Sequence, residues 1–309
     1  MRTFVIRDKF TVKPTLQHEW GWLIAAAFFL GKVGAGLFLI SLAVGLQPGI
    51  IVGFVVATVG KGIFHIAYLG RPERFWRAMS RPAASWISRG LWAMAIFAVS
   101  GLLFILLPRG GGPLWEVVRF VVVISGLVLA SYDGFVMSAP RAIRMWNSAV
   151  VPLLAFLYSM LGGITLTIVI DYFFGSGYAI PTDSLRYAEL GLIVINLLIV
   201  LAYTVNNMLG AEQAARESVA LLVKGKYAPF FVGGVIIIGL ILPVLIAGFL
   251  IGESSAALLV LAIGDLIGHF LVFYLLLLVG MYAPIRVRER RGAKAVGTER
   301  SPVTNKIRA

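Results

Sequence analysis

Residues 229–251 read PFFVGGVIIIGLILPVLIAGFLI, an apolar run without a single charged side chain. A helix of about 20 apolar residues is long enough to cross the hydrocarbon core of a bilayer. Residues 233–242 within this run are apolar on every face, whereas a strand of a membrane barrel alternates apolar and polar side chains. The run therefore predicts a transmembrane helix.

Seven other segments have a similar length and composition. The eight predicted spans are 20–46, 49–69, 86–107, 117–137, 149–174, 187–209, 229–251 and 256–281. Because an even number of crossings returns the chain to its starting side, they predict an all-α integral membrane protein, a bundle of eight transmembrane helices with both termini on the same side. The predicted organisation is a basic arm over residues 1–19, a membrane domain over 20–282 and a basic, partly disordered tail over 283–309.

The composition excludes several classes of protein. Of the 309 residues, 60% are hydrophobic and 13% are charged, whereas a soluble domain is about 25% charged. The absence of cysteine excludes a disulfide, a thiolate zinc site and an iron–sulfur cluster on this chain. Three histidines allow at most one bis-histidine haem, so a two-haem cytochrome b is excluded.

The net charge of +13 is distributed unevenly. Lys and Arg number 22 on the side of the termini and three on the opposite side, and two more lie within the spans. Positively charged loops stay preferentially in the cytoplasm. The distribution therefore predicts a multi-pass protein of the cytoplasmic (inner) membrane with cytoplasmic termini, and the charge does not indicate nucleic-acid binding.

Charged residues deep in the spans are the first candidates for a functional role. Lys32 and Lys61 lie ~18 and ~15 Å from the basic ends of their spans, and Asp265 lies ~15 Å from the opposite end of the last span. His269 follows Asp265 by one helical turn, and His65 follows Lys61 in the same way. Burying such groups is costly. One interpretation is a proton relay through Lys32, Lys61, Asp265 and His269, with His65 one turn from Lys61. The other is a structural ion pair of a lysine with the aspartate that only neutralises buried charge.

A second polar stripe lies in the sixth predicted span. Asn196, Tyr203 and Asn207 share one helical face. Hydrogen bonding between neighbouring helices is the interpretation that this spacing favours.

The connection between the second and third spans carries a recognisable pattern. Residues 68–77 read YLGRPERFWR and residues 85–90 read SWISRG. Residues 131–135, SYDGF, near the end of the fourth span, and 20–22, WGW, at the start of the first, add to it. This ordered set resembles the NrfD/PsrC family, the membrane subunits of polysulfide-reductase-type oxidoreductases, along nearly the whole chain.

The resemblance implies an eight-helix quinol-binding subunit of a respiratory oxidoreductase. Such a subunit exchanges electrons with an iron–sulfur, ferredoxin-like partner and a catalytic subunit, often of the molybdopterin type. The expected cofactor is a quinone, either menaquinone or ubiquinone, with no haem and no iron–sulfur cluster on this chain.

A quinone pocket needs aromatic walls, hydrogen-bond donors for two carbonyl oxygens and a group that titrates near neutral pH. Side chains of these types gather where the first, second and fourth spans reach the basic side, and Tyr132 matches the family's quinone tyrosine. An interfacial aromatic belt is the alternative interpretation of the Trp and Tyr residues. The predicted quinone-binding residues are His18, Trp20, His65, Tyr68, Tyr132 and Asp133.

Five arginines follow the second span, with Glu73 as the one acid among them. They could dock the acidic face of a partner, bind the phosphates of membrane lipid, or only fix the topology. The predicted docking residues are Arg71, Arg74, Arg77, Arg81 and Arg89.

Two other functions remain open at this stage. A proton- or cation-coupled carrier would explain the deep charges, but carriers commonly have interrupted helices in two repeated halves, and the sequence shows no such repeat. A passive anchor for soluble subunits would not need buried charge.

Overall fold

The computed structural model describes residues 13–108, 110, 112–210, 212–249 and 255–284. The chain divides into two compact units, one of residues 14–283 and one of residues 1–13 and 284–309. Only Lys13 and Pro284 of the second unit are among the described residues. Most of the predicted basic arm and nearly all of the predicted tail therefore lie outside the described residues.

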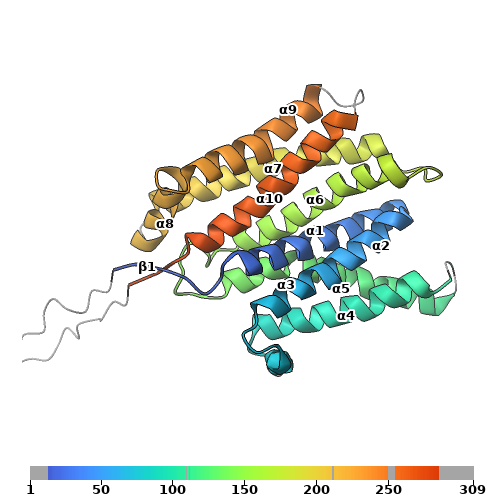
Figure 1. Ribbon diagram of the computed structural model, residues 1–309, viewed down its shortest axis with the longest axis horizontal. Helices are drawn as coiled ribbons and strands as arrows, with labels where there is room; N and C mark the ends of the chain where they lie inside the picture. Colours follow the sequence, from blue (N-terminus) through green and yellow to red (C-terminus); the bar gives the residue numbers. More distant parts are fainter. Residues whose placement is uncertain (1–12, 109, 111, 211, 250–254, 285–309) are drawn as a thin grey trace, which may run out of the picture. The chain divides into compact units, whose positions relative to one another are not determined.

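Helices form almost the whole of this unit (Figure 1). The elements, in chain order, are β1 (Thr15–Leu16), α1 (Trp22–Val44), α2 (Gln47–Val55), the π-helix η1 (Val56–Gly60), α3 (Lys61–Tyr68), the 3₁₀-helix η2 (Pro72–Met79), α4 (Trp86–Leu106), α5 (Pro113–Ser138), α6 (Val150–Phe174), α7 (Thr182–Leu209), α8 (Gln213–Val223), the π-helix η3 (Pro229–Ile241), α9 (Leu242–Phe249), α10 (Ser255–Leu278) and β2 (Met281–Tyr282).

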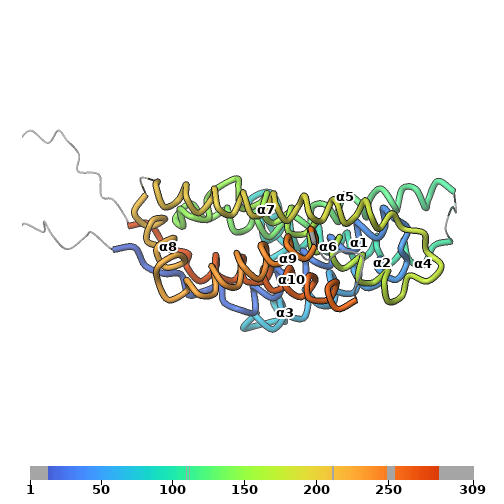
Figure 2. The backbone as a smooth tube through the Cα atoms, turned by 90° about the horizontal axis from the view of Figure 1, so that it is seen from above, coloured from blue at the N-terminus to red at the C-terminus, as the bar shows by residue number. Residues whose placement is uncertain are grey.

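Eight helical segments of the described chain are long and apolar enough to cross a membrane, which confirms the predicted all-α integral membrane fold. Strand β1 pairs with β2 in an antiparallel register that places Thr15 opposite Tyr282. The chain therefore enters and leaves the bundle at one end, here called the basic end. Helix α8 lies at the same end in both views (Figures 1 and 2).

Two helices begin four or five residues earlier than the hydropathy pattern predicted. Helix α5 begins at Pro113 rather than at residue 117, and α7 begins at Thr182 rather than at 187. Their first turns carry Glu116 and Asp183. Acidic residues stabilise the amino end of a helix, and proline suits its first turn, so these polar turns are helical although they are not apolar.

Two spans contain π-helical turns that the sequence analysis did not predict. The second span is α2, η1 and α3 in succession, and the seventh is η3 followed by α9. Pro243 lies at the start of α9, and because proline has no N–H it cannot donate to the carbonyl one turn earlier. In the second span, η1 ends immediately before Lys61. Such turns occur frequently at functional sites.

Helix α1 lies in the middle of the bundle, where it packs against α2, α3, α5, α6 and α10 (Figure 1). Two glycines allow its close contact with α6. A Cβ atom added at Gly36 would lie 1.8 Å from the carbonyl oxygen of Ser159, and one added at Gly163 would lie 2.4 Å from Gly36. A polar side chain on α1 can therefore interact with several helices.

Candidate functional site

A buried ion pair joins α3 to α5. The Nζ atom of Lys61 lies 2.8 Å from Oδ1 of Asp133, and the two residues are only 1% and 0% exposed. Gly31 of α1 leaves the space that the lysine fills, since a Cβ atom there would lie 2.6 Å from Nζ. Both charges lose their hydration when such a pair is buried, and this cost offsets most of the attraction between them. A buried ion pair therefore adds little stability compared with apolar residues of the same size, although removing only one partner is strongly destabilising. The pair is therefore a candidate for function rather than a necessary part of the core.

Aromatic rings enclose the Lys61–Asp133 pair. The Nζ atom of Lys61 lies 5.4 Å from the centre of the Phe28 ring and 5.5 Å from that of Tyr132, within the range of a cation–π interaction. The Tyr132 ring rests against Gly90 of α4, where a Cβ atom would overlap it. Tyr132 and Phe28 thus form two walls of the site.

Two polar atoms at the Lys61–Asp133 pair lack a hydrogen-bond partner in the described part of the chain. One is the second carboxylate oxygen, Oδ2, of Asp133, which is fully buried. The other is the hydroxyl oxygen of Tyr132, a residue that keeps 6% of its surface exposed. Buried polar atoms are nearly always satisfied in folded proteins. These atoms could therefore donate to and accept from a ligand.

Lys32 extends the site toward the middle of the bilayer. It is fully buried, and its Nζ atom lies 3.6 Å from the centre of the Phe273 ring and 5.7 Å from that of Phe28. Nζ has no hydrogen-bond partner among the described residues, but it lies within electrostatic range of Asp133. Cation–π contact and the nearby carboxylate thus partly compensate its burial.

His269 lies beyond Lys32 and is also fully buried. Its ring centre lies 5.2 Å from that of Phe29, 5.1 Å from that of Tyr158 and 6.0 Å from that of Phe273. Neither ring nitrogen has a hydrogen-bond partner in the described chain. Among the described residues, His269 is therefore held by ring packing alone.

Phe28 connects the buried pair to an aromatic layer at the basic end. The Trp20 ring lies 6.0 Å from that of Phe28 and stacks on Trp146 at 5.4 Å. Gln17 fixes this layer by donating to the carbonyl oxygens of Trp20 and Leu277. The predicted quinone residue Trp20 is thus held between the buried pair and the basic end. Trp146, which stacks on it, belongs to the same aromatic layer but was not predicted from the sequence.

The remaining predicted quinone residues lie at different distances from the buried pair. His65 is half-buried, with Nδ1 3.1 Å from the carbonyl oxygen of Lys61 and its ring centre 6.3 Å from that of Phe28. The Tyr68 hydroxyl donates to the carbonyl oxygen of Glu19 at the edge of the site. His18 is exposed beside Glu19 and does not lie in the buried cluster.

Glu19 and Tyr282 form a hydrogen bond of 3.0 Å at the basic end. Backbone N–H donors and the Tyr282 hydroxyl hold the pKa of the Glu19 carboxyl below its ordinary value. Burial and the hydrogen bond to this carboxylate raise the pKa of Tyr282. At neutral pH the contact is thus a carboxylate accepting from a phenol, and it ties the segment before α1 to β2.

The structure gives Lys61 and Asp265, two members of the predicted proton relay, different direct partners. Lys61 pairs with Asp133, whereas Asp265 interacts with Thr165. Helix α1 lies between α3 and α10 (Figure 1) and packs against each of them. A similar depth along the helices was therefore insufficient to predict that Lys61 and Asp265 are partners, because α1 lies between the helices that carry them.

Glu189 is a buried residue that the sequence analysis missed. It lies seven residues before Asn196, which in turn lies seven residues before Tyr203, so all three share one face of α7. Extending the predicted polar stripe by one step toward the start of the helix would have found it. The Tyr203 end of this stripe is structural, since its hydroxyl donates to the carbonyl oxygen of Met145.

The five predicted docking arginines are all exposed, four on η2 and the connections around it and Arg89 in the first turn of α4. Exposed aromatic side chains accompany them, with Phe75 and Trp76 50% and 58% exposed. Arg89 is held in place by donating to the carbonyl oxygens of Pro82 and Ala83. This connection therefore presents both positive charge and apolar surface.

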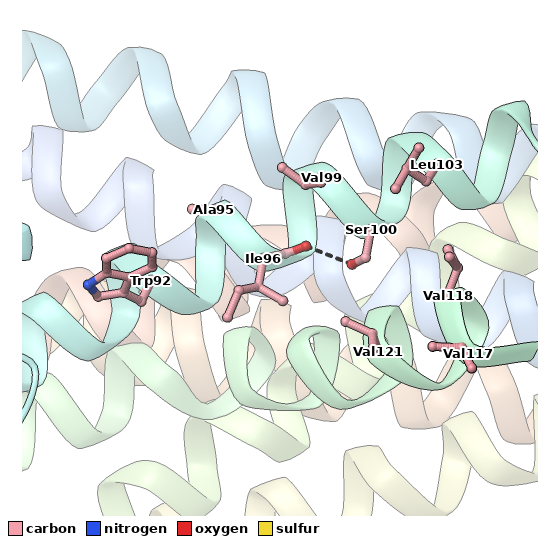
Figure 3. Close-up of a pocket in the computed structure, with 9 residues that line it drawn as sticks. All are labelled: Trp92, Ala95, Ile96, Val99, Ser100, Leu103, Val117, Val118 and Val121. Carbon is pink, nitrogen blue, oxygen red and sulfur yellow. Dashed lines mark hydrogen bonds between the residues drawn. The ribbon is translucent and has the colours of Figure 1, made fainter. Parts of the chain in front are cut away.

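An apolar pocket of about 390 Å³ lies between α4 and α5 (Figure 3). The Ser100 hydroxyl donates to the carbonyl oxygen of Ile96, and the Trp92 indole N–H donates to that of Met79. The pocket therefore offers no free donor to a quinone oxygen, and it contains none of the predicted site residues. The lining residues are Trp92, Ala95, Ile96, Val99, Ser100, Leu103, Val117, Val118 and Val121.

Comparisons with known proteins agree with the arrangement of spans and motifs. The family described as "Polysulphide reductase, NrfD" matches residues 14–284. The chain is 25% identical over 306 residues to a protein NrfD homolog of Haemophilus influenzae, with 84% of this chain and 94% of the relative covered. It is 22% identical over 301 residues to protein NrfD of Escherichia coli, with the same coverage.

Proposed function

The chain belongs to the NrfD family, as its sequence motifs predicted, and from this premise we propose that it is the quinone-binding membrane anchor of a multisubunit respiratory oxidoreductase. It exchanges electrons between the quinone pool of the membrane, menaquinone or ubiquinone, and an iron–sulfur, ferredoxin-like partner. The substrate chemistry takes place on a further catalytic subunit of the molybdopterin type.

The observation that carries this proposal is the free hydroxyl of Tyr132 beside the buried Lys61–Asp133 pair. A bound quinone supplies two carbonyl oxygens that take up protons with electrons and release them on oxidation. Tyr132 would donate a hydrogen bond to one of these oxygens. The ion pair would hold or accept the proton that the quinone exchanges. Each member stabilises the charged form of the other, so a change of charge on one member alters the proton affinity of its partner.

The surrounding residues support the same function. Phe28, Trp20 and Trp146 would form the apolar walls that a planar ring requires. His65, half-buried beside Lys61, would exchange protons with the basic end. Lys32 and His269, which both contact the Phe273 ring, would extend the proton relay from the buried pair toward the middle of the bilayer.

Quinone content and quinol-dependent electron transfer test the proposal. The intact complex, purified in mild detergent, should contain about one extractable quinone per copy of this chain, and a reduced quinol analogue should reduce the partner's iron–sulfur clusters. The control is membrane from a strain that lacks this chain but makes its partners. Quinone-free complex whose clusters are not reduced by any quinol would contradict the proposal.

The exposed arginine connection is the surface that we assign to partner docking. Arg74→Glu should weaken recovery of the partner subunits with the tagged chain, and the loss should grow with ionic strength because exposed charge pairs are screened. Arg119→Glu is the matched control, since Arg119 is equally exposed but lies in the second turn of α5, near the opposite end. Equal recovery for both variants would assign the arginines to topology alone.

We further propose that the termini and the docking surface face the cytoplasm, from the charge distribution of 22 against three basic residues. An alkaline phosphatase fused after Ala309, which is active only when exported, should be inactive, whereas a cytoplasmic reporter at the same position should be active. The reverse pattern would place the partners outside the cytoplasm.

The carrier function receives no support from the two spans that contain π-helical turns. Carriers use the ends of broken helices to bind substrate near the bilayer centre, whereas α2, η1 and α3 continue into one another, as do η3 and α9. A passive anchor would leave the buried pair and the free Tyr132 hydroxyl without a role. The redox function therefore fits the site better than either alternative.

A further inference from the structure

A second buried polar cluster lies in the half of the bundle away from the basic end. The Thr165 hydroxyl oxygen lies 2.6 Å from Oε1 of Glu189 and 3.1 Å from Oδ2 of Asp265. The three residues come from α6, α7 and α10 and are at most 1% exposed. Counting from the helix ends, they lie ~10–15 Å from the face opposite the basic end. We call them the carboxyl pair and its bridge.

The geometry of the bridge requires a proton on one carboxyl. A threonine hydroxyl carries one hydrogen and can donate it to only one acceptor. The 2.6 Å contact with Glu189 is the shorter and is typical of donation to a carboxylate. The contact with Asp265 is then a hydrogen bond only if Asp265 carries a proton and donates it to the threonine oxygen.

The electrostatic surroundings of the carboxyl pair lead to the same conclusion. Neither carboxyl forms an ion pair within the described part of the chain. The cationic side chain within electrostatic range of Glu189 is that of Arg186, which is half-buried and lies one turn earlier on α7. Two ionised carboxylates in an apolar interior without a paired cation would be very costly.

Two buried groups lie between the carboxyl pair and Lys32. Tyr158 lies seven residues before Thr165 on α6, and its hydroxyl is buried without a partner and within electrostatic range of Asp265. His269, one turn after Asp265 on α10, contacts the Tyr158 ring and lies within electrostatic range of Lys32. The polar residues therefore continue from the carboxyl pair to the site near the basic end.

Asn196 adds a further unpartnered group on α7. Its Oδ1 atom is buried without a hydrogen-bond partner among the described residues, and it shares the helical face of Glu189. The groups that can influence the carboxyl pair are thus Tyr158, His269, Asn196 and Arg186. None of them forms an ion pair with either carboxyl in the described part of the chain.

We propose that Glu189 and Asp265 share one proton through Thr165 and form a proton-loading site that exchanges with the aqueous phase opposite the quinone site. A proton from that side binds Glu189, and Asp265 gives up its own proton toward Tyr158 and His269. The Thr165 hydroxyl then passes its hydrogen to the deprotonated Asp265 as it takes one from Glu189, which restores the starting state. The number of protons is conserved at each exchange. This inference deepens the proposed function, because such a site matters only where quinone chemistry takes up or releases protons.

Infrared spectroscopy of the purified complex tests the shared proton independently of quinone chemistry. The wild type should show a protonated carboxyl band at pH 7 that shifts in D₂O, and Asp265→Asn should lose it. Glu116→Gln is the matched control, since this glutamate is exposed on α5 and should leave the band unchanged. A band that Asp265→Asn leaves unchanged would overturn the proposal.

A second variant keeps the test decisive if Asp265→Asn does not fold. Thr165→Val has nearly the same shape and keeps both carboxyls but removes the bridge, so the band should move toward the position of a carboxyl without a hydrogen bond. Thr165→Ser should restore the wild-type position. An unchanged band in Thr165→Val would show that the hydroxyl does not bridge a protonated pair.

Proton transfer in proteoliposomes tests the loading role. Glu189→Gln should keep quinol-dependent electron transfer but lose proton movement across the membrane, whereas Glu116→Gln should keep both. Unchanged proton movement in Glu189→Gln would overturn the loading role. If wild-type complex failed to oxidise or reduce quinone, the proposed function would fail, while the infrared result would still decide whether the pair shares a proton.

Discussion

Asp133→Leu should destabilise the protein by about 3–5 kcal/mol, because it leaves the Lys61 ammonium buried without its carboxylate partner. Quinol-dependent turnover should be lost in the same variant. Thermal unfolding of the purified complex in detergent, followed by circular dichroism, measures the first effect. Electron transfer from a quinol analogue to the partner's clusters measures the second.

The double variant Lys61→Met/Asp133→Leu separates structure from function. Removing both charges should recover part of the lost stability, since replacing a buried ion pair by apolar residues is often neutral or stabilising, whereas Lys32 still loses its nearby carboxylate. Turnover should not recover, because the site would have lost its proton-exchanging groups. Lys32, which lies within electrostatic range of Asp133, is retained in this variant and does not replace the pair.

The exposed pair of Glu116 and Arg119, 3.6 Å apart, is the control for this experiment. Glu116→Gln should change the free energy of unfolding by no more than ~1 kcal/mol, because exposed ion pairs are worth little. If Asp133→Leu had an equally small effect, the pair would not be buried and charged. If the double variant kept full quinol turnover, the pair would be structural only.

Tyr132→Phe should reduce quinol-dependent turnover roughly 5- to 150-fold, which corresponds to the ~1–3 kcal/mol cost of losing a buried hydrogen-bond partner. Turnover with a soluble redox dye should be unchanged, since the dye donates to the partner subunits directly. Phenylalanine keeps the ring that packs against Gly90, so the complex should assemble normally. The ratio of the two activities is the quantity to measure.

Tyr203→Phe is the matched control for Tyr132→Phe. It also removes a buried hydroxyl, but this one donates to the carbonyl oxygen of Met145 away from the Lys61–Asp133 pair. It should lower stability and leave the ratio of quinol to dye activity unchanged. A parallel loss of both activities in Tyr132→Phe would indicate defective assembly and contradict the assignment of Tyr132.

Hydropathy and motif spacing by themselves determined the eight spans and the family, and they placed Lys32, Lys61 and Asp265 well inside their spans. This was possible because a membrane helix needs a fixed length of apolar residues, and because each residue advances a helix by a constant 1.5 Å. The same regularity gives the face on which a side chain lies. Lys61 and His65, one turn apart, are therefore neighbours in the structure as well.

Only the tertiary structure decided which helices lie side by side, and hence which charges meet. The close contacts of α1 at Gly31 and Gly36 place α3 and α6 around it, so that Lys61 meets Asp133. Asp265 lies on the opposite side of α1 and meets Thr165 and, through it, Glu189. Lateral order depends on the fit of small side chains between helices that are apolar on most faces, and no periodicity within one helix encodes it.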